Sequence, residues 1–381
     1  MVGKVMLESV ITAHTDALDA YFAPTRHIPL TSSVDIRHAG YKIASVDCNL
    51  FPAGLHLLHN PDPKILARAL QPFTPSRVLI IPEAHTKNLN PLESSLTLAH
   101  MLKQCGIQTG FGWIKPIGEP LIIKSLSKED VLCEPIFLEN NKLRTKSLLP
   151  DLIILTNDCT EGYPTSFDHA IQPIVPSYML GWHKRLKSNH AAKYNERATK
   201  VAALLGIDPF QLTVDYEAAP SLSESLDALA EKAQTLLDRL TKRYKEQGIK
   251  TRPSLFMKNN AGTYGMGVMH IASIDELFEL NRRDKNKMQI GKHRQVVRSL
   301  LLQEALVTID RVHGAAAEPV ITSIQDTVLG GFYRYHKERS ALDNLNATNM
   351  AFAPLEPSLT HKLVARIAAH AAADELQESM S

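Results

Sequence analysis

A lysine placed just before a glycine-rich loop is the arrangement in this sequence that most directly suggests chemistry. Lys258 ends a short apolar run, and glycines follow it before a second apolar run at 268–271. Glycines let backbone N–H groups approach a phosphate without a Cβ in the way, and the lysine supplies a point charge for phosphate oxygens. The sequence therefore predicts a phosphate-binding hairpin. Its expected contact residues are Lys258, Gly262, Thr263, Tyr264, Gly265 and Gly267.

The spacing of these glycines excludes two better-known phosphate loops. No Gly-Lys-Ser/Thr follows the loop and no helix opens at its end, so it is not a Walker A motif. The dinucleotide-binding fingerprint has differently spaced glycines that lead into a helix. A lysine and a glycine loop between two strands are typical of ATP-grasp ligases, which predicts ATP as the nucleotide. The alternative is a glycine-rich hairpin that binds nothing.

Two polar residues end a later apolar strand, at 299–304. Gln303 and Glu304 come some forty residues after Lys258, in the order that ATP-grasp folds use. A carboxylate at this place can accept hydrogen bonds from both ribose hydroxyls, while backbone groups read the adenine edge. We therefore predict that Gln303 and Glu304 bind ATP. A solvated strand end is the alternative.

Arginine and oxygen-bearing side chains cluster near the C-terminus. Arg334 ends a predicted strand at 328–335, and its planar fork suits carboxylate or phosphoryl oxygens. We predict catalytic roles for Lys258 and Arg334. Asn344 and Asn346 would point to the same side of an extended segment, whereas a turn is the alternative. Oxygen ligands suit Mg²⁺, which also takes oxygens from ATP. The candidate ligands are Glu318, Asp326, Asn344 and Asn346.

The segment 33–54 mixes charged and amide groups with apolar ones, and glycine and proline constrain its backbone. A pocket for an amino-acid zwitterion needs a cation for the α-carboxylate and an acid for the ammonium group. The locally basic segment 181–190 could bind phosphate or carboxylate groups. The alternatives are an Asp–Arg pair that holds a loop and a solvated basic helix start. The predicted substrate-binding residues are Asp35, Arg37, Asp47, Asn49, Arg185 and Lys187.

Composition narrows the class of protein. The chain has 381 residues, enough for two or three domains, with 44% hydrophobic and 22% charged residues. A net charge of +2 gives no support to nucleic-acid binding. No apolar run reaches the ~18 residues of a membrane span, and the first residues do not read as a signal peptide. The four cysteines are scattered without a Cys-x-x-Cys pair, which favours reduced thiols and a cytoplasmic location.

The predicted elements belong to an α/β protein. Apolar runs at 77–82 and 152–156 predict buried strands, with a helix at 92–104 between them, and this alternation favours a mainly parallel sheet. The predicted division is an N-terminal α/β domain at 1–190 with the amino-acid pocket, a helical linking region at 191–250, and an ATP-grasp-like domain at 251–381. Further helices are expected at 195–205, 221–247 and 361–375, and further strands at 254–258, 268–271, 299–304, 318–324 and 328–335.

Several of these segments together resemble one family. The sequence is similar to the proteobacterial glutamate–cysteine ligases from about residue 30 to 370. This resemblance implies ATP-dependent joining of the glutamate γ-carboxylate to the cysteine amine through an acyl phosphate, the first step of glutathione synthesis. It implies Mg²⁺ and small-molecule substrates, and a homo-oligomer is possible. The matching segments are 34–42, 46–54, 82–88, 181–190, 257–268, 330–334 and 344–347.

Two other interpretations stay open from the sequence. A different ATP-grasp ligase, such as a glutathione-synthetase-like enzyme, would share the glycine loop and differ in the pocket at 33–54. A nucleotide-binding protein without turnover is the second. It is favoured by the lack of the Glu-x-Asn metal pair that typical ATP-grasp enzymes carry late in the domain.

Overall fold

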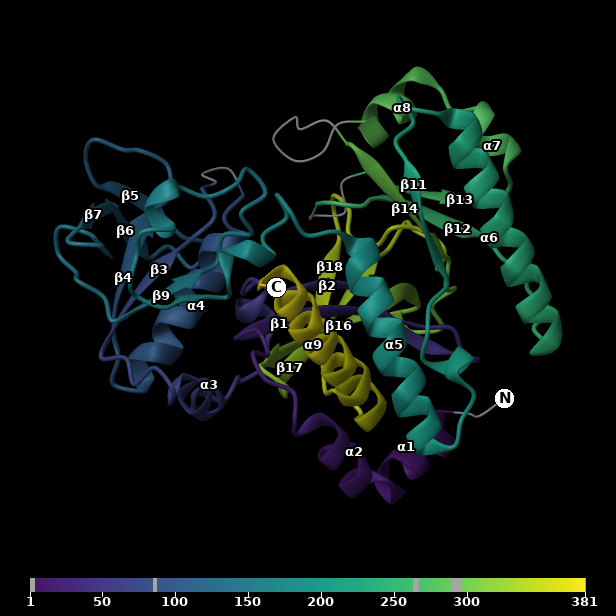
Figure 1. The fold of residues 1–381 in the computed structure, drawn as a ribbon, viewed down its shortest axis with the longest axis horizontal. Helices are drawn as coiled ribbons and strands as arrows, with labels where there is room; N and C mark the ends of the chain where they lie inside the picture. Colours follow the sequence, from purple (N-terminus) through teal and green to yellow (C-terminus); the bar gives the residue numbers. More distant parts are fainter. Residues whose placement is uncertain (1–3, 85–87, 263–266, 290–296, 381) are drawn as a thin grey trace.

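The computed structural model describes residues 4–84, 88–262, 267–289 and 297–380. Three larger sheets and their covering helices make up the molecule, and both chain ends contribute to its centre (Figure 1). The strands are β1 (Thr31–His38), β2 (Ile43–Asn49), β3 (Arg77–Ile81), β4 (Gln108–Trp113), β5 (Leu121–Lys124), β6 (Asp130–Pro135), β7 (Phe137–Glu139), β8 (Lys142–Arg144), β9 (Leu152–Leu155), β10 (Ile174–Val175), β11 (Tyr216–Pro220), β12 (Leu255–Asn259), β13 (Val268–Ile271), β14 (Ser299–Glu304), β15 (Arg311–Val312), β16 (Ala315–Ile324), β17 (Thr327–His336) and β18 (Ala351–Leu355).

Helices surround these sheets and join them. None of the helices in the described part of the chain is both long and apolar enough to cross a membrane. The helices are α1 (Lys4–Ala13), α2 (Thr15–Phe22), η1 (Leu55–Leu57), α3 (Pro63–Leu70), α4 (Asn90–Gln104), η2 (Thr165–Phe167), η3 (Tyr178–Leu180), α5 (Lys187–Leu205), η4 (Pro209–Gln211), α6 (Leu226–Glu246), α7 (Asp275–Phe278), α8 (Arg282–Gln289) and α9 (Leu359–Met380).

The first sheet confirms the predicted mainly parallel α/β arrangement. Its strand order is β10-β9-β3-β4-β6-β5, and every neighbouring pair is parallel except β5 with β6. Strands β3 and β9 are nearly fully buried because helices α3 and α4 cover one face, while the alternate residues enter the main core. Continuous burial of this kind explains why their sequences are uninterrupted apolar runs.

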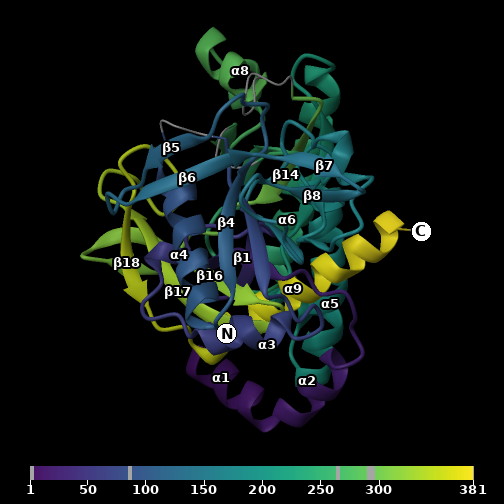
Figure 2. The same cartoon turned by 90° about the vertical axis from the view of Figure 1, so that its left-hand side faces the viewer.

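The central sheet is antiparallel and combines the two ends of the chain. Its order is β18-β17-β16-β1-β2, with β15 paired to β16. Helix α9 lies across one face and packs against α5, and the sheet residues Val34 and Ile36 share a core cluster with Val364 and Ile367 of α9 (Figure 1). Seen from the side, α1 and α2 lie at one end of the molecule, below this layer (Figure 2).

The third sheet is a four-stranded antiparallel one, in the order β11-β14-β12-β13. Leu255 and Met257 of β12 and Leu300 and Leu302 of β14 pack against the apolar face of α6. The intervening residues point to the opposite face, because side chains alternate along a strand. Lys258 therefore faces away from α6 and toward the central sheet.

The strand pairing crosses the predicted domain boundaries. β1 and β2 lie within 1–190 and pair with each other, yet β1 also pairs with β16 of the range 251–381. The range 191–250 contains α6 and most of α5, which begins at Lys187, but also β11, which belongs to the sheet of β12 and β14. The division by residue number therefore does not follow the sheets.

Candidate active site

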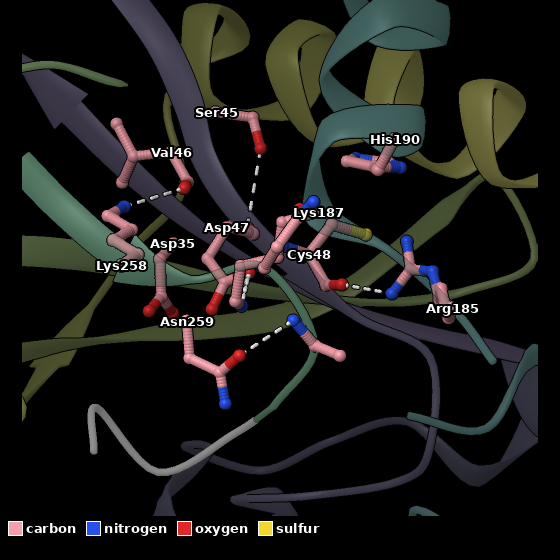
Figure 3. Close-up of polar contacts among 12 residues, drawn as sticks. Asp35, Ser45, Val46, Asp47, Cys48, Arg185, Lys187, His190, Lys258 and Asn259 are labelled. Carbon is pink, nitrogen blue, oxygen red and sulfur yellow. Dashed lines mark hydrogen bonds and ion pairs between the residues drawn. The ribbon is translucent and has the colours of Figure 1, made fainter. Parts of the chain in front are cut away.

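A cavity of about 60 Å³ opens between the central sheet and the four-stranded sheet. Figure 3 shows its charged side chains converging from β1, β2, β12 and the start of α5. Ten of the residues predicted for the site line this cavity. The lining residues are Asp35, Arg37, Val46, Asp47, Lys187, Phe256, Lys258, Asn259, Gly262, Val268, Leu306, Glu318, Arg334, Asn344 and Asn346.

Strand register brings four of these charges together. Asp35 of β1 lies directly opposite Asp47 of β2, and Glu318 of β16 lies directly opposite Arg334 of β17. Because β1 also pairs with β16, the four residues occupy one continuous region of the central sheet. Residues more than 280 positions apart in sequence meet here through strand pairing.

Arg37 and Arg334 form ion pairs with carboxylates of the cavity. Arg334 Nη2 lies 2.7 Å from Asp35 Oδ1, and Arg334 Nη1 lies 3.5 Å from Glu318 Oε1. Arg37 Nε donates to Glu318 Oε2 at 2.7 Å. One alternative drawn from the sequence was an ion pair between an aspartate and an arginine of this segment, Asp35 and Arg37. In the structure, Arg37 pairs with Glu318 and Asp35 pairs with Arg334.

Burial and these ion pairs shift the pKa values of Asp35 and Glu318 in opposite directions. Burial raises the pKa of Asp35, and repulsion from Glu318 and Asp47 adds to the effect against the attraction of Arg334. Burial also acts to raise the pKa of Glu318, but Arg37 and Arg334 outweigh it and lower that pKa. Glu318 is therefore held as a carboxylate between two guanidinium groups.

Arg37 also fastens a loop to the cavity. Its Nη1 donates to the carbonyl oxygen of Ala341 at 2.8 Å, and its Nη2 donates to that of Asp343 at 3.0 Å. Asn344 and Asn346 follow directly. The segment is a turn rather than extended, since the Asn344 side chain accepts the backbone N–H of Asn346 at 3.0 Å. Both asparagines nevertheless line the cavity.

Lys258 is held at the cavity by neutral acceptors. Its Nζ donates to Gln303 Oε1 at 2.6 Å and to the Val46 carbonyl oxygen at 3.1 Å. Burial, with repulsion from Lys187 and Arg37, lowers the pKa of Lys258 to about 8 against the attraction of Asp47. Gln303 thus positions the lysine from the neighbouring strand and does not itself line the cavity.

The start of α5 is tied to the glycine-rich hairpin. The Lys187 and Ser188 N–H groups donate to Asn260, at 2.7 Å to its carbonyl oxygen and 2.9 Å to its side chain. Lys187 Nζ lies 2.5 Å from Asp47 Oδ1, and this pairing, with Lys258 nearby, lowers the pKa of Asp47 although burial opposes it. The basic segment 181–190 therefore reaches the cavity through Lys187.

In the hairpin, Gly262 lines the cavity at a φ of +151°, a conformation that favours glycine, and Gly267 lies at +63°. Thr263, Tyr264 and Gly265, which were predicted to contact ATP, lie outside the described residues.

Glu304 lies away from the cavity, unlike its neighbour Gln303. Its carboxylate is fully buried and accepts hydrogen bonds from Lys42 Nζ at 2.7 Å, Tyr244 Oη at 2.9 Å and the Asp215 N–H at 3.2 Å. Alternation along β14 turns it toward α6. In this structure Glu304 joins the sheets together, and the solvated strand end considered as an alternative is not what is found.

Three other predicted residues also lie apart from the cavity. Arg185 donates two hydrogen bonds to the Glu375 carboxylate and one to the Cys48 carbonyl oxygen. The Asn49 side-chain oxygen is buried and has no hydrogen-bond partner among the residues that the structure describes. Asp326 lies in the β16–β17 turn near Arg366 and His370, at the opposite end of that hairpin from Glu318, so it cannot share a metal site with it.

The sequence reasoning missed the apolar wall of the cavity. Phe256, Val268, Leu306 and Val46 line it beside the charges. One signal was available, because Phe256 precedes Lys258 by two residues and must share its face of β12. An apolar wall next to a cationic cluster suits a ligand with a flat ring and a charged tail.

The cavity offers oxygen ligands of the kind that Mg²⁺ takes. Glu318 contributes a carboxylate, and Asn344 and Asn346 contribute amide oxygens, so the donor chemistry fits an ion that also binds phosphates and water. In the described ranges, no group of three or more His, Cys, Asp or Glu residues could hold a metal by itself.

The antiparallel hairpin sheet, the opposing central sheet and the cationic cavity between them define an ATP-grasp-like α/β protein. A sequence profile of the family described as glutamate-cysteine ligase matches residues 8–378. The chain belongs to this glutamate–cysteine ligase family, which confirms the resemblance seen in the sequence.

Solved structures agree with the family assignment. A Methylobacillus flagellatus protein, provisionally named gamma-glutamylcysteine synthetase, is 31% identical, with a TM-score of 0.85 over 98% of this chain and 96% of its own. A D-cycloserine synthetase (12% identity, TM-score 0.46, covering 79% and 82%) and a glutathione synthetase-like effector from Globodera pallida (11%, 0.44, 88% and 82%) are more distant, and their TM-scores are too low to support a conclusion. No curated protein sequence matched.

Proposed function

We propose that this protein joins the γ-carboxylate of glutamate to the α-amine of cysteine at the expense of ATP, giving γ-glutamylcysteine, ADP and phosphate. The observation that carries the proposal is the convergence of Arg37, Lys187, Lys258 and Arg334 on one cavity beside an apolar wall, in a member of the glutamate–cysteine ligase family. Four cations in a partly buried site suit a triphosphate and a carboxylate.

A carboxylate is a poor acyl donor, so the reaction needs an activated intermediate. A glutamate γ-carboxylate oxygen attacks the γ-phosphorus of ATP, and ADP leaves. The cysteine nitrogen then attacks the acyl carbon, the bond to the phosphate oxygen breaks, and the amine loses a proton. Such chemistry depends mainly on positioning and charge stabilisation, and no side-chain nucleophile is required.

The cavity residues divide this work by their chemistry. Lys258 and Arg334 would stabilise the transferring phosphoryl group, while Asp35 and Asp47 are acids suited to a substrate ammonium group. Glu318, Asn344 and Asn346 would hold Mg²⁺, which neutralises phosphate charge when bound. In this geometry Arg37 holds the loop that carries the two asparagines. Its predicted role in carboxylate binding remains a prediction.

Several finer expectations also remain predictions. Gln303 positions Lys258, and Glu304 already has three donors, so adenine recognition near them would fall to backbone groups. Direct substrate contacts of Asn49 and Arg185, a cytoplasmic location and a homo-oligomer are likewise untested.

The proposal is tested by ADP release from the purified protein. We expect release only when both glutamate and cysteine are present, with γ-glutamylcysteine identified by mass spectrometry. ADP release with a different pair of amino acids would assign the protein to another carboxylate–amine ligase reaction. ATP binding without turnover under all these conditions would contradict the proposal and support a nucleotide-binding role.

A further inference from the structure

A cysteine, a histidine and a glutamate lie in line behind the wall of the active-site cavity. Cys48 is 1% exposed and follows Asp47 on β2, so its side chain points to the opposite side of the strand. The thiol interacts with the ring of His190 on α5, and His190 Nδ1 lies 2.5 Å from Glu375 Oε1 on α9. Figure 3 shows the Cys48 sulfur and His190 next to each other, behind Asp47 and Lys187.

The histidine ring carries a positive charge at neutral pH. Burial alone would lower the pKa of His190, but the Cys48 sulfur and the Glu375 carboxylate raise it to about 9. The Glu375 carboxylate in turn is fixed by Arg185, so the cluster is rigidly held.

A small cavity of about 10 Å³ adjoins this cluster. Cys48, His190 and Tyr194 line it, together with Asp47 and Lys187, which also line the active-site cavity. The space corresponds to roughly one water-sized oxygen atom. His190 is 6% exposed, and its Nε2 makes no hydrogen bond of ordinary geometry to any described residue, although the Cys48 sulfur lies beside the ring. The site thus combines a thiol, a histidine donor and room for a single oxygen.

We propose that Cys48 is a site of oxidation by small peroxides, which convert it to a sulfenic acid. In this step the sulfur attacks one peroxide oxygen, the O–O bond breaks and an S–O bond forms. The hydroxide, or the alkoxide from an organic hydroperoxide, leaves and combines with the thiol proton as water or an alcohol, and the sulfur loses the two electrons that the peroxide gains. The His190 nitrogen then has an acceptor in the new oxygen.

The position of Cys48 couples its oxidation to the active site. The Asp47–Lys187 ion pair separates the two cavities, so an oxygen on the sulfur lies directly behind it. Oxidation is therefore expected to displace this pair and to stop turnover. That consequence rests on the proposed ligase activity, whereas the oxidation itself does not.

Cys133 and Cys105 have a different environment. Burial raises the pKa of Cys133 to about 12. Cys105 is only half-buried, but burial and the nearby Asp62 raise its pKa, and its Sγ donates to the Pro63 carbonyl oxygen at 3.4 Å. Cys105 is therefore a useful internal control, because access alone would make it react before Cys48.

The test is peroxide treatment of the intact protein in the presence of dimedone, which traps sulfenic acids, followed by mass spectrometry of peptides. We expect dimedone on Cys48 earlier than on Cys105, and slower labelling of Cys48 when ATP and glutamate fill the active site. Labelling of Cys105 first, or no labelling of Cys48, would overturn the proposal whether or not the protein is a ligase.

Variants separate reactivity from its effect on turnover. Wild-type protein and Cys105→Ser should lose activity with peroxide and regain it with dithiothreitol, because sulfenic acid is reversible. Cys48→Ser should keep its activity after the same treatment. Equal loss in Cys48→Ser would refute the coupling to the active site. If that variant does not fold, the order of labelling in wild-type protein still decides the proposal.

Discussion

The charged side chains of the cavity are already paired with one another before any ligand arrives. Arg334 binds Asp35, Arg37 binds Glu318 and Lys187 binds Asp47, while the hydrogen bonds of Lys258 to described residues go to neutral groups. An anionic ligand must compete with a carboxylate for the other three cations. Of these four cations, Lys258 is the one best prepared to receive a phosphate oxygen.

Replacing Lys258 should therefore stop turnover while leaving the fold intact. We expect Lys258→Ala to reduce kcat by roughly 10²-fold or more, because one preorganised charge at a transferring group is lost. The measurement is ADP release, with circular dichroism and the melting temperature as controls of folding. A well-folded variant with near wild-type activity would exclude a phosphate role for this lysine.

The lowered pKa of Lys258 gives a prediction for pH dependence. A lysine with a pKa of about 8 loses its charge as the pH rises through that value. We expect kcat/KM for ATP, measured with saturating glutamate and cysteine, to fall above this pH, since kcat/KM reports the free enzyme. Lys258→Arg keeps its charge and should lack this decline. The same decline in both proteins would assign it to another group.

A substitution at Arg37 tests whether this residue has a structural or a substrate-binding role. A lysine at this position can keep the pair with Glu318 but loses the bonds to Ala341 and Asp343, each worth about 1.5–3 kcal/mol. We expect Arg37→Lys to lower the melting temperature and to change the Michaelis constants of glutamate, cysteine and ATP together. A selective rise for glutamate at an unchanged melting temperature would show that Arg37 binds the substrate carboxylate.

At the scale of elements, the sequence predicted individual strands and helices better than it predicted which strands pair. The strand at 299–304 and the two strands of the β16–β17 hairpin agree closely with the sequence, because apolar runs are local signals. Helix α6 begins later than predicted, at Leu226, because Ser225 caps it by accepting the Ala228 N–H. The pairing of β1 with β16 left no local signal.

The unpredicted strand pairing also explains why the contacts within the site could not be predicted. The sequence placed Asp35 and Arg37 in one pocket, but which arginine meets which carboxylate depends on the register between strands from opposite ends of the chain. Glu304 was misplaced for a related reason. Its face of β14 is set by α6, whose packing partner the sequence alone did not identify.

Strand β17 offers a matched test of packing, with two adjacent glycines. A Cβ on Gly331 would approach Ile321 Cδ1 to 2.8 Å and the Val320 carbonyl oxygen to 3.1 Å, whereas one on Gly330 would lie 3.5 Å from Leu58. We expect Gly331→Ala to destabilise the fold by about 1–3 kcal/mol through overpacking. It should also reduce activity, because β17 carries Arg334.

Gly330→Ala is the control and should change the free energy of unfolding by no more than about 0.5 kcal/mol. Both values can be measured by urea denaturation. Equal destabilisation by the two substitutions would mean that β17 responds to any side chain at this place, and not to the contact with Ile321.

At the scale of the whole molecule, a buried ion pair joins two sheets. Lys42 follows β1 of the central sheet and binds Glu304 of the four-stranded sheet at 2.7 Å, and both side chains are 0% exposed. Removing one partner leaves the other charge buried and unpaired. We expect Lys42→Ala to cost about 3–5 kcal/mol of stability, measured by urea denaturation.

The exposed pair of Lys200 with Glu196 on α5 provides the comparison, since both side chains are 56% exposed. Lys200→Ala should cost only about 0.3–0.5 kcal/mol, as is usual for such helix pairs. If Lys42→Ala cost no more than Lys200→Ala, the pair with Glu304 would not be holding the two sheets together.

The central sheet also has a consequence for synthesis on the ribosome. Strands β1 and β2 are finished by residue 49, but β16, the other partner of β1, begins only at residue 315. At about 5–20 residues per second, the nascent chain waits on the order of ten to fifty seconds before this sheet can form. The parallel sheet between residues 77 and 175 can fold during that interval. Meanwhile the edge of β1 stays open, so a chaperone that shields extended segments would act on this protein while it is being translated.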